Sequence, residues 1–456
     1  MVCKEQMKSL ITLFKQAKLH IFTIHYNLVN RIREIEKLHR LWTVIFNKII
    51  PLLGTILLMA HAFFSSWDRD IGKILYNSFL VVWVIGGYYK KTFRILTKYK
   101  PFIFLMAFLF LLSMGILWSN DPRYGKCVVN RYEYLALIAA FIPIINKKNF
   151  KYVAFALMGG LFLILINSYL IKFNVIHQEN PHLYPAFKIT YQVVSFYLGV
   201  LIVGFLYFAL HFFEKKQNIK AIFSLVLILP TFYQQISIHV QGRGALISML
   251  VAIVVLVIAK YPKHIKKAIP LVFLFIVLMS WLALSYSPMV KTRFADVYQH
   301  IIQMQKGNYI TSLGYRWVYF DVGTAIIAEN PFFGIGTGEQ KKAFSELVQN
   351  YKEGIYFPIL KSFPTYHFHN DYIEIAVQIG LVGLLLYILT MYSLIRILKE
   401  STFFPLVIAI LTMFWINGLS DVMFVHRVII YFLAVFLALA ISEVRSRSAD
   451  YADYTD

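Results

Sequence analysis

Long apolar runs alternate with short polar connections along almost the whole chain. Each run approaches the roughly 20 residues that an α-helix needs to cross a bilayer. Because the runs are continuous rather than alternating at period two, they predict membrane-spanning helices and exclude a porin-like barrel. The predicted spans are residues 41–64, 74–89, 101–118, 132–145, 150–171, 191–213, 221–239, 244–259, 268–286, 372–398, 403–418 and 428–443. The expected fold is an all-α polytopic membrane protein of about twelve transmembrane helices.

The distribution of lysine and arginine predicts how these spans are oriented. Basic residues are dense in every second connection and sparse in the others, although the sparse ones are longer in total. The dense groups are Lys90/Lys91/Arg94/Lys98/Lys100, Lys147/Lys148/Lys151, Lys215/Lys216/Lys220, Lys260/Lys263/Lys266/Lys267 and Arg396/Lys399. Since cytoplasmic connections carry the excess positive charge, both termini are expected in the cytoplasm.

The amino-acid composition is that of a membrane protein and argues against a soluble domain or a nucleic-acid-binding protein. Of 456 residues, 59% are hydrophobic and 15% are charged, which lies outside the usual range of soluble domains. The formal charge of +22 is explained by loops that face anionic membrane lipids, so no nucleic-acid partner is expected. Cys3 and Cys127 are predicted on opposite sides of the membrane and therefore do not pair.

The chain divides into five parts. Residues 1–40 are basic, and their apolar residues recur at three- and four-residue spacing, which predicts an amphipathic helix on the cytoplasmic leaflet rather than a cleavable signal. Docking of this helix on a partner is the alternative. Residues 41–286 hold the first nine spans, 287–371 a large outer loop, 372–443 the last three spans, and 444–456 a cytoplasmic tail.

The outer loop, residues 287–371, is much longer than an ordinary connection, which indicates a functional segment. A helix over Arg316–Ala328 is predicted to end at Asn330-Pro331, and a second helix is predicted over 338–351. The sequence GIGTG at 334–338 lies between them. Glycine-rich loops can bind phosphate, but no P-loop lysine or serine follows and no strand precedes, so a plain turn is favoured.

Three ionisable side chains on the predicted outer side are candidates for chemistry. Arg243 lies in QGRG between two apolar runs, where a guanidinium group either reaches to the membrane surface or binds a ligand. Arg316 lies in GYRW of the outer loop, and His369 precedes a span. An exposed arginine is often merely solvated and a loop histidine merely structural. Guanidinium groups nevertheless suit bidentate phosphate binding, and imidazole transfers protons near neutral pH.

His367 and His369 also suggest a metal site, with Asp371 and Glu374 as nearby carboxylates. A zinc site needs three or four well-placed ligands, and the local sequence marks no third one. No metal and no other cofactor are therefore expected.

Three motifs in order resemble one family. They are QGRGALISML after an apolar run, YRWVYFDVGTAIIAENPFFGIGTG in the outer loop, and HNDYIEIAVQIGLVGLLLY at the start of the next span. Together they cover roughly residues 240–400 and resemble the O-antigen ligase and O-antigen polymerase superfamily. The first half of the chain is similar to this family only in hydropathy.

The resemblance implies a glycosyltransferase of the bacterial inner membrane with a periplasmic active site. Such proteins take a glycan from undecaprenyl diphosphate and transfer it to lipid A-core, to another lipid-linked glycan or to a protein. Ligation to lipid A-core is the expected reaction, with O-antigen polymerase and protein O-oligosaccharyltransferase as alternatives. A transporter of lipid-linked glycan would also hold diphosphate with arginines, but the sequence shows no pair of related halves of the kind that transporters commonly contain.

The resemblance also implies residue roles. Arg243 and Arg316 are expected to bind the diphosphate, where charge grows as the sugar–oxygen bond breaks. His369 is expected to orient or deprotonate the acceptor hydroxyl, with Asp371 or Glu374 as helpers. Asn370 and Asp371 are expected to contact substrate. Arginines would supply the charge that a metal supplies elsewhere.

Overall fold

The computed structural model describes residue 37 and residues 39–447, apart from 182, 188, 238–242, 287 and 363–366. The described residues are predominantly helical, with one isolated bridge between Ala186 and Ile189 and no strand among them. The helices before the outer loop are α2 (Ile50–Phe64), α3 (Arg69–Ile85), α4 (Tyr88–Lys98), α5 (Lys100–Met114), α6 (Pro122–Tyr132), α7 (Leu137–Phe141), α8 (Phe150–Lys172), α9 (Tyr191–Glu214), α10 (Asn218–Ser237), α11 (Arg243–Lys260) and α12 (Ile265–Tyr286). Most of the predicted amphipathic N-terminal segment and the end of the tail lie outside the described residues.

The remaining helices form the outer loop and the C-terminal spans. They are α13 (Pro288–Gln305), α14 (Ser312–Glu329), α15 (Gln340–Asn350), α16 (Pro358–Ser362), α17 (Asp371–Leu398), α18 (Phe404–Asn417) and α19 (Arg427–Arg447). Both helices predicted inside the outer loop are confirmed, and Asn330 ends α14 as expected. Pro331 follows Asn330, and the residue before a proline disfavours the helical conformation.

Seven helices among the described residues are long and apolar enough to cross a membrane, or eight if α3 and α4 form one span bent by 96°. They are His39–Phe64, Lys100–Trp118, Phe150–Lys172, Tyr191–Glu214, Asn218–Ile236, Asp371–Leu398 and Arg427–Arg447. Gly244–Lys260 and Phe404–Asn417 are shorter apolar helices. The chain is therefore an all-α polytopic membrane protein, whereas the count of twelve spans is not confirmed.

Two of the predicted spans differ in the structure. Residues 132–145 do not form one helix, because α6 ends at Tyr132 and only a short 3-10 turn and the five-residue α7 follow. The span predicted over 74–89 ends at Ile85, and Gly87 takes a positive φ of 67° where the chain bends into α4. Hydropathy identifies the apolar residues of both predicted spans but not the points at which their helices are interrupted.

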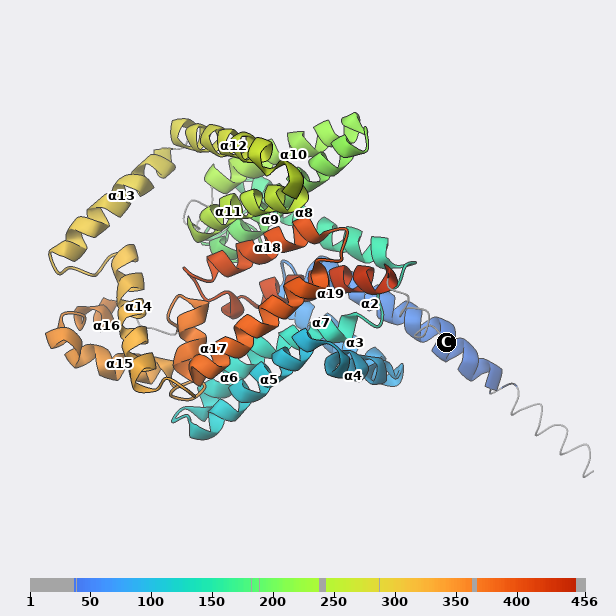
Figure 1. The fold of residues 1–456 in the computed structure, drawn as a ribbon, viewed down its shortest axis with the longest axis horizontal. Helices are drawn as coiled ribbons and strands as arrows, with labels where there is room; N and C mark the ends of the chain where they lie inside the picture. The colour runs from blue at the N-terminus through green and yellow to red at the C-terminus, as the bar shows by residue number, and fades with distance from the viewer. Residues whose placement is uncertain are drawn as a thin grey trace, which may run out of the picture.

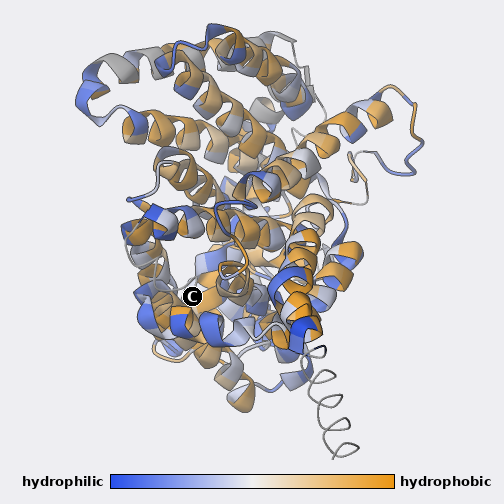
Figure 2. Ribbon diagram, turned by 90° about the vertical axis from the view of Figure 1, so that its right-hand side faces the viewer, coloured by the Kyte–Doolittle hydropathy of each residue, from blue (hydrophilic) through white to orange (hydrophobic). Residues whose placement is uncertain are grey.

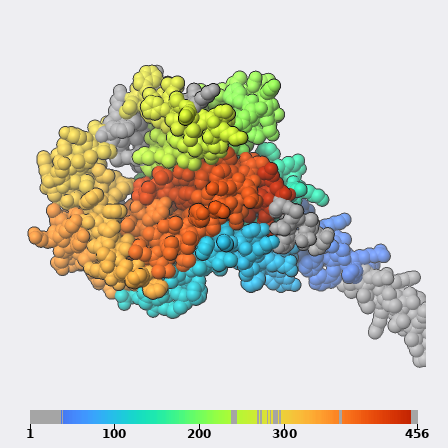
Figure 3. Space-filling view, in the orientation of Figure 1, coloured from blue at the N-terminus to red at the C-terminus, as the bar shows by residue number. Residues whose placement is uncertain are grey.

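The long helices form one bundle, with α13–α16 gathered at one end of it (Figure 1). Apolar residues cover most of each long helix, and hydrophilic residues gather near helix ends and in connections (Figure 2). The spans α9 and α19 are the most enclosed, each with 83% of its apolar window buried. Segments far apart in sequence adjoin, since α17 packs along α5 and α11 along α18. In the space-filling view, the surfaces of α14 and α15 directly adjoin that of α17 (Figure 3).

A second, smaller apolar cluster holds the outer helices against the start of α17. It joins Val318, Tyr319, Val322 and Ile326 of α14 to Phe344 and Val348 of α15, Tyr356, Ile359, Phe368, Ile373 and Val377. Burying apolar area contributes about 25 cal/mol per Å², so this cluster stabilises the position of α14. The side chains that α14 carries are thereby fixed relative to residues 368–377.

The segment 331–338 fills a break in α17. Ile379 and Gly380 have non-helical backbone angles, which free carbonyl and amide groups inside the helix. The carbonyls of Pro331 and Phe332 accept from Leu381 and Val382, at 2.7 and 3.3 Å. In return, the carbonyls of Val377 and Gln378 accept from Ile335 and Gly336, both at 3.0 Å. The break is therefore satisfied by the outer loop, as buried backbone groups require.

This arrangement decides between the two interpretations of GIGTG. Besides Ile335 and Gly336, the amide of Thr337 donates to the Gly115 carbonyl at 3.0 Å and that of Gly338 to Gln378 Oε1 at 3.1 Å. Four successive amides thus donate to protein acceptors. A phosphate-binding loop needs such amides to point at its ligand, so the structure favours the turn.

Candidate functional site

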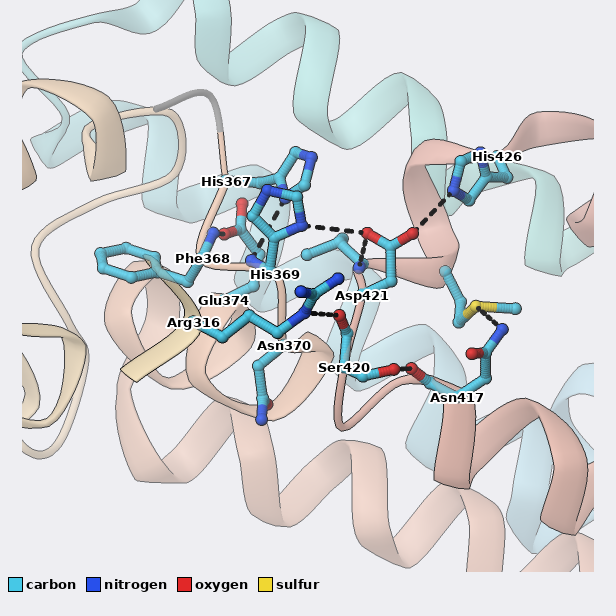
Figure 4. Close-up of polar contacts among 12 residues, drawn as sticks. Arg316, His367, Phe368, His369, Asn370, Glu374, Asn417, Ser420, Asp421 and His426 are labelled. Carbon is cyan, nitrogen blue, oxygen red and sulfur yellow. Dashed lines mark hydrogen bonds and ion pairs between the residues drawn. The ribbon is translucent and has the colours of Figure 1, made fainter. Parts of the chain in front are cut away.

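The polar turn between α18 and α19, residues 418–426, is the point where the candidate residues meet. Figure 4 shows His369 and Arg316 approaching this turn from two different elements. Backbone contacts fix the approach, because the Asp371 amide donates to the Gly418 carbonyl at 2.8 Å. The Asn370 side-chain amide donates to the Leu419 carbonyl at 3.1 Å.

His369 faces Asp421 of this turn. Its Nδ1 lies 3.4 Å from Asp421 Oδ1, and the imidazole stacks on the ring of Tyr319 with centroids 5.4 Å apart. The backbone of His369 has a positive φ of 49°, a conformation in which few non-glycine residues are found. Such local strain persists where the surroundings hold it, and here it turns the imidazole towards the turn.

Asp421 is held as an anion. Its Oδ2 lies 3.3 Å from His426 Nε2, and its Oδ1 accepts from the Val422 amide at 2.9 Å. Burial alone would raise the pKa of the Asp421 carboxyl, but the contacts with His369 and His426 outweigh burial and hold this pKa well below its usual range. A permanent carboxylate facing Nδ1 keeps a proton on that nitrogen, which leaves Nε2 of His369 as the basic atom.

Arg316, near the start of α14, extends to the same α18–α19 turn. Its Nε donates to the Ser420 carbonyl at 3.2 Å, and its Nη1 donates to the Ser312 carbonyl and hydroxyl at 2.8 and 2.9 Å. Among the described residues, Nη2 has no hydrogen-bond partner, and the side chain is exposed. The guanidinium group is therefore held through Nε and Nη1, which leaves the two N–H groups of Nη2 for a ligand.

The side chain of Arg243 lies outside what the structure describes, but the start of its helix is placed. Gly244 packs so closely on the turn that a Cβ added to it would overlap Ser420 Oγ and Asn417 Oδ1. The first residues of α11 thus adjoin the residue whose carbonyl binds Arg316. All three motifs singled out in the sequence converge on the α18–α19 turn.

The helper roles predicted for Asp371 and Glu374 are not supported. Asp371 is 1% exposed, and its carboxylate lies near the backbone amides of Met423 and Phe424. Glu374 is also buried and accepts from the Phe368 amide and from the side chains of Gln340 and Gln378. The carboxylate that meets His369 is Asp421.

Asn370 has a structural role in the described site. Its Oδ1 accepts from the amides of Tyr372 and Ile373, at 2.9 and 3.0 Å, and so caps the N-terminus of α17. The contact of Asn370 and Asp371 with substrate stays a prediction.

His367 lies beside His369, with ring centroids 4.2 Å apart, and its Nδ1 accepts from the His369 amide at 3.2 Å. Burial, with the nearby charge of His369, lowers the pKa of His367 to about 3, so the ring is neutral near pH 7. Donor atoms of His367, His369 and Asp421 lie within 4.8 Å of one another. A third ligand for the histidine pair is therefore present in space, and Asp421 supplies it instead of Asp371 or Glu374.

Sequence reasoning missed Asp421 and His426. Both lie in the short connection between α18 and α19, LSDVMFVHR, whose polar residues interrupt an apolar region. That interruption is the only local signal, since neither residue has a spacing relation to HFHND. The contact of Asp421 with His369 follows from the fold, which brings the α18–α19 connection beside the segment that precedes α17, and His426 in turn contacts Asp421.

The fold and site define a class: a polytopic membrane protein with an aspartate–histidine pair and an arginine gathered at one turn between helices. Residues 236–388 match the family model described as O-antigen ligase, a range that contains Arg243, Arg316 and His369. An O-antigen ligase of Escherichia coli (strain K12) is 26% identical over 204 residues, which are 44% of this chain and 48% of that protein. An uncharacterized protein of Haemophilus influenzae is 30% identical over 187 residues, 40% of this chain and 44% of that protein.

Residues 236–388 are therefore similar to the O-antigen ligase family, and the rest of the chain lies outside this match. The aligned regions span about half the length of each of these relatives. The match covers the outer loop and the first part of α17, the same region that carries the three motifs.

Proposed function

We propose that the protein is an O-antigen ligase that moves a glycan from undecaprenyl diphosphate to lipid A-core on the periplasmic face of the bacterial inner membrane. The single observation that carries this proposal is the meeting of Arg316 with the His369–Asp421 pair at the α18–α19 turn. An anion-binding group and a proton-accepting group at one membrane-surface site suit transfer from a lipid diphosphate to a hydroxyl.

The arginines act on the leaving group. Arg316, with Arg243 at the start of α11, binds the diphosphate, whose negative charge grows as the bond to the anomeric carbon breaks. Fixed charges of this kind stabilise a transition state without having to reorganise. The hydrogen bonds of Arg316 to Ser420 and Ser312 hold its guanidinium group in place for this task.

His369 acts on the acceptor. Its Nε2 takes the proton of the acceptor hydroxyl as that oxygen bonds to the anomeric carbon, and the diphosphate departs with the electrons of the broken bond. Asp421 holds the proton on Nδ1 and stabilises the imidazolium ion that forms. Direct displacement inverts the anomeric configuration. Arginine and imidazole supply the charge and proton transfer, so the reaction requires no metal.

A transporter of lipid-linked glycan would need the arginines but not a base. The paired carboxylate and imidazole therefore favour transfer over transport. Ligase and polymerase share this chemistry and differ in the acceptor.

Gel analysis of lipopolysaccharide from a deletion strain tests the proposal. Loss of all polymer on the core, with lipid-linked polymer accumulating, supports a ligase, whereas a core that bears one repeat unit supports a polymerase. His369→Ala and Arg316→Ala are expected to reproduce the deletion at normal protein level. Normal lipopolysaccharide from both variants would overturn the catalytic assignment.

A further inference from the structure

His367, His369 and Asp421 present two imidazole nitrogens and one carboxylate oxygen within 4.8 Å of one another. This donor set is found in zinc sites that use three protein ligands and leave a fourth position open. Mg²⁺ and Ca²⁺ prefer sites made of oxygen atoms. The side chains therefore select a divalent transition metal.

The separation of two of these donors suits a shared metal better than a strong hydrogen bond. His369 Nδ1 and Asp421 Oδ1 are 3.4 Å apart, whereas a charge-assisted N–H···O bond is about 2.7–2.9 Å long. A tetrahedron with corners about 2.1 Å from a central zinc ion has edges of about 3.4 Å. The distance between His369 Nδ1 and Asp421 Oδ1 therefore equals the distance expected between two ligand atoms of one zinc ion.

The remaining geometry supports a metal site. The second oxygen of Asp421 is held by His426 Nε2 at 3.3 Å, and outer contacts of this kind orient ligating carboxylates. The side chains of His369 and Asp421 are 28% and 16% exposed, which leaves an approach for an ion. The donor atom of His367 lies within 4.8 Å of the other two, and a rotation of its side chain brings that nitrogen to a shared ion.

We infer that His367, His369 and Asp421 form a zinc-binding site that blocks the base of the active site. Zinc on Nδ1 of His369 leaves the imidazole proton on Nε2, and that nitrogen then has no lone pair for the proton of an acceptor. The inhibitory effect rests on the proposed function, whereas zinc binding by the three side chains does not.

Calorimetric titration of the purified full chain with Zn²⁺ tests the site. The protein carries an affinity tag without histidine and is first treated with chelator. The variants are His367→Gln, which removes a ligand, and His264→Gln, which removes an exposed histidine of the turn Pro262–His264. Co²⁺ provides a second readout, because tetrahedral coordination gives it strong visible absorption.

We expect one Zn²⁺ per chain in the parent protein and in His264→Gln. In His367→Gln, affinity should fall by more than about tenfold, since loss of a second-shell contact alone costs about 10- to 100-fold. Excess Mg²⁺ should not compete. Equal zinc affinity in His367→Gln, or no stoichiometric binding to the parent protein, would overturn the inference.

A transfer assay separates this inference from the proposed function. Zinc should slow the parent protein and slow His367→Gln much less at the same concentration. Stoichiometric zinc binding without any transferase activity would contradict the proposed function and leave the zinc site standing. Activity that zinc inhibits equally in both proteins would contradict the zinc site and leave the function standing.

Discussion

His369 and Asp421 come from two separate connections and face each other with Nδ1 3.4 Å from Oδ1. The pairing assigns different tasks to the two nitrogens of one ring, since the nitrogen beside the carboxylate keeps its proton and the other is free to accept one. Because Asp421 is itself held by His426 and the Val422 amide, its position does not depend on His369 alone.

Asp421→Asn should lower the transfer rate by about 10²- to 10⁴-fold, the range typical of proton transfer by a positioned group. An amide of the same size carries no charge to stabilise the imidazolium ion. The measurement is kcat/KM of the purified protein. Asp70→Asn, at the exposed Arg69–Asp70 pair, is the matched control. Similar rates for both variants would remove Asp421 from the mechanism.

Arg316→Ala should lower the rate by about 10²- to 10³-fold, because a preorganised charge contact is lost at the leaving group. Arg316→Lys should recover only part of this loss. An ammonium group has three donors, so a lysine that contacts Ser420 and Ser312 has only one N–H left for a diphosphate, whereas the arginine keeps both N–H groups of Nη2. Rates are compared with Arg69→Ala, an exposed arginine. Full activity of the lysine variant would show that charge alone suffices.

Chelator should leave the activity of the purified protein intact, because arginines and an imidazole carry the chemistry. The assay compares the initial rate before and after exhaustive treatment with chelator, followed by readdition of Mg²⁺ or Zn²⁺. Complete loss of activity that Mg²⁺ restores would mean that the proposed mechanism lacks an essential ion.

Gly380→Ala should destabilise the protein far more than Gly87→Ala. Both glycines have a positive φ, 69° and 67°, so both changes introduce backbone strain. Gly87 is in the left-handed helical region, where the strain is about 1–2 kcal/mol. Gly380 has a ψ of −174°, a region that essentially only glycine adopts and where the strain is about 1–3 kcal/mol. A Cβ at Gly380 would also collide with the Phe332 carbonyl, whereas nothing lies within 4 Å of one at Gly87. Thermal unfolding in detergent measures the difference. Equal midpoints would show that the packing of Phe332 on the break yields easily.

The class of fold was predictable because its signal is local. Membrane spans follow from the length and continuity of apolar runs, and the two outer-loop helices follow from their stop signals, such as Asn330-Pro331. The break in the span predicted over 132–145 and the kink at Gly380 were not predictable. Both depend on which carbonyls and amides a distant segment supplies, and hydropathy does not record that.

The candidate site was predictable only in part. Arg316 and His369 were identified from motif residues, and the fold brings both to one turn. Asp371 and Glu374 were expected as helpers of His369 because they are near it in sequence, and that role stays a prediction. The helical turn at the start of α17 directs both side chains into the interior, where each is at most 2% exposed. Asp421 faces His369 only because the folded chain brings the α18–α19 turn beside the start of α17, and no local sequence pattern records that contact.

The backbone hydrogen bonds between residues 331–338 and the break in α17 have a consequence for biogenesis. The ribosome delivers Pro331 and Phe332 before the amides of Leu381 and Val382, to which their carbonyls are bonded in the finished protein. Residues 331–338 therefore cannot complete these hydrogen bonds until the following helix has been synthesised. A nascent chain halted before Gly380 should be open to protease in this region, and one released after α17 should resist it.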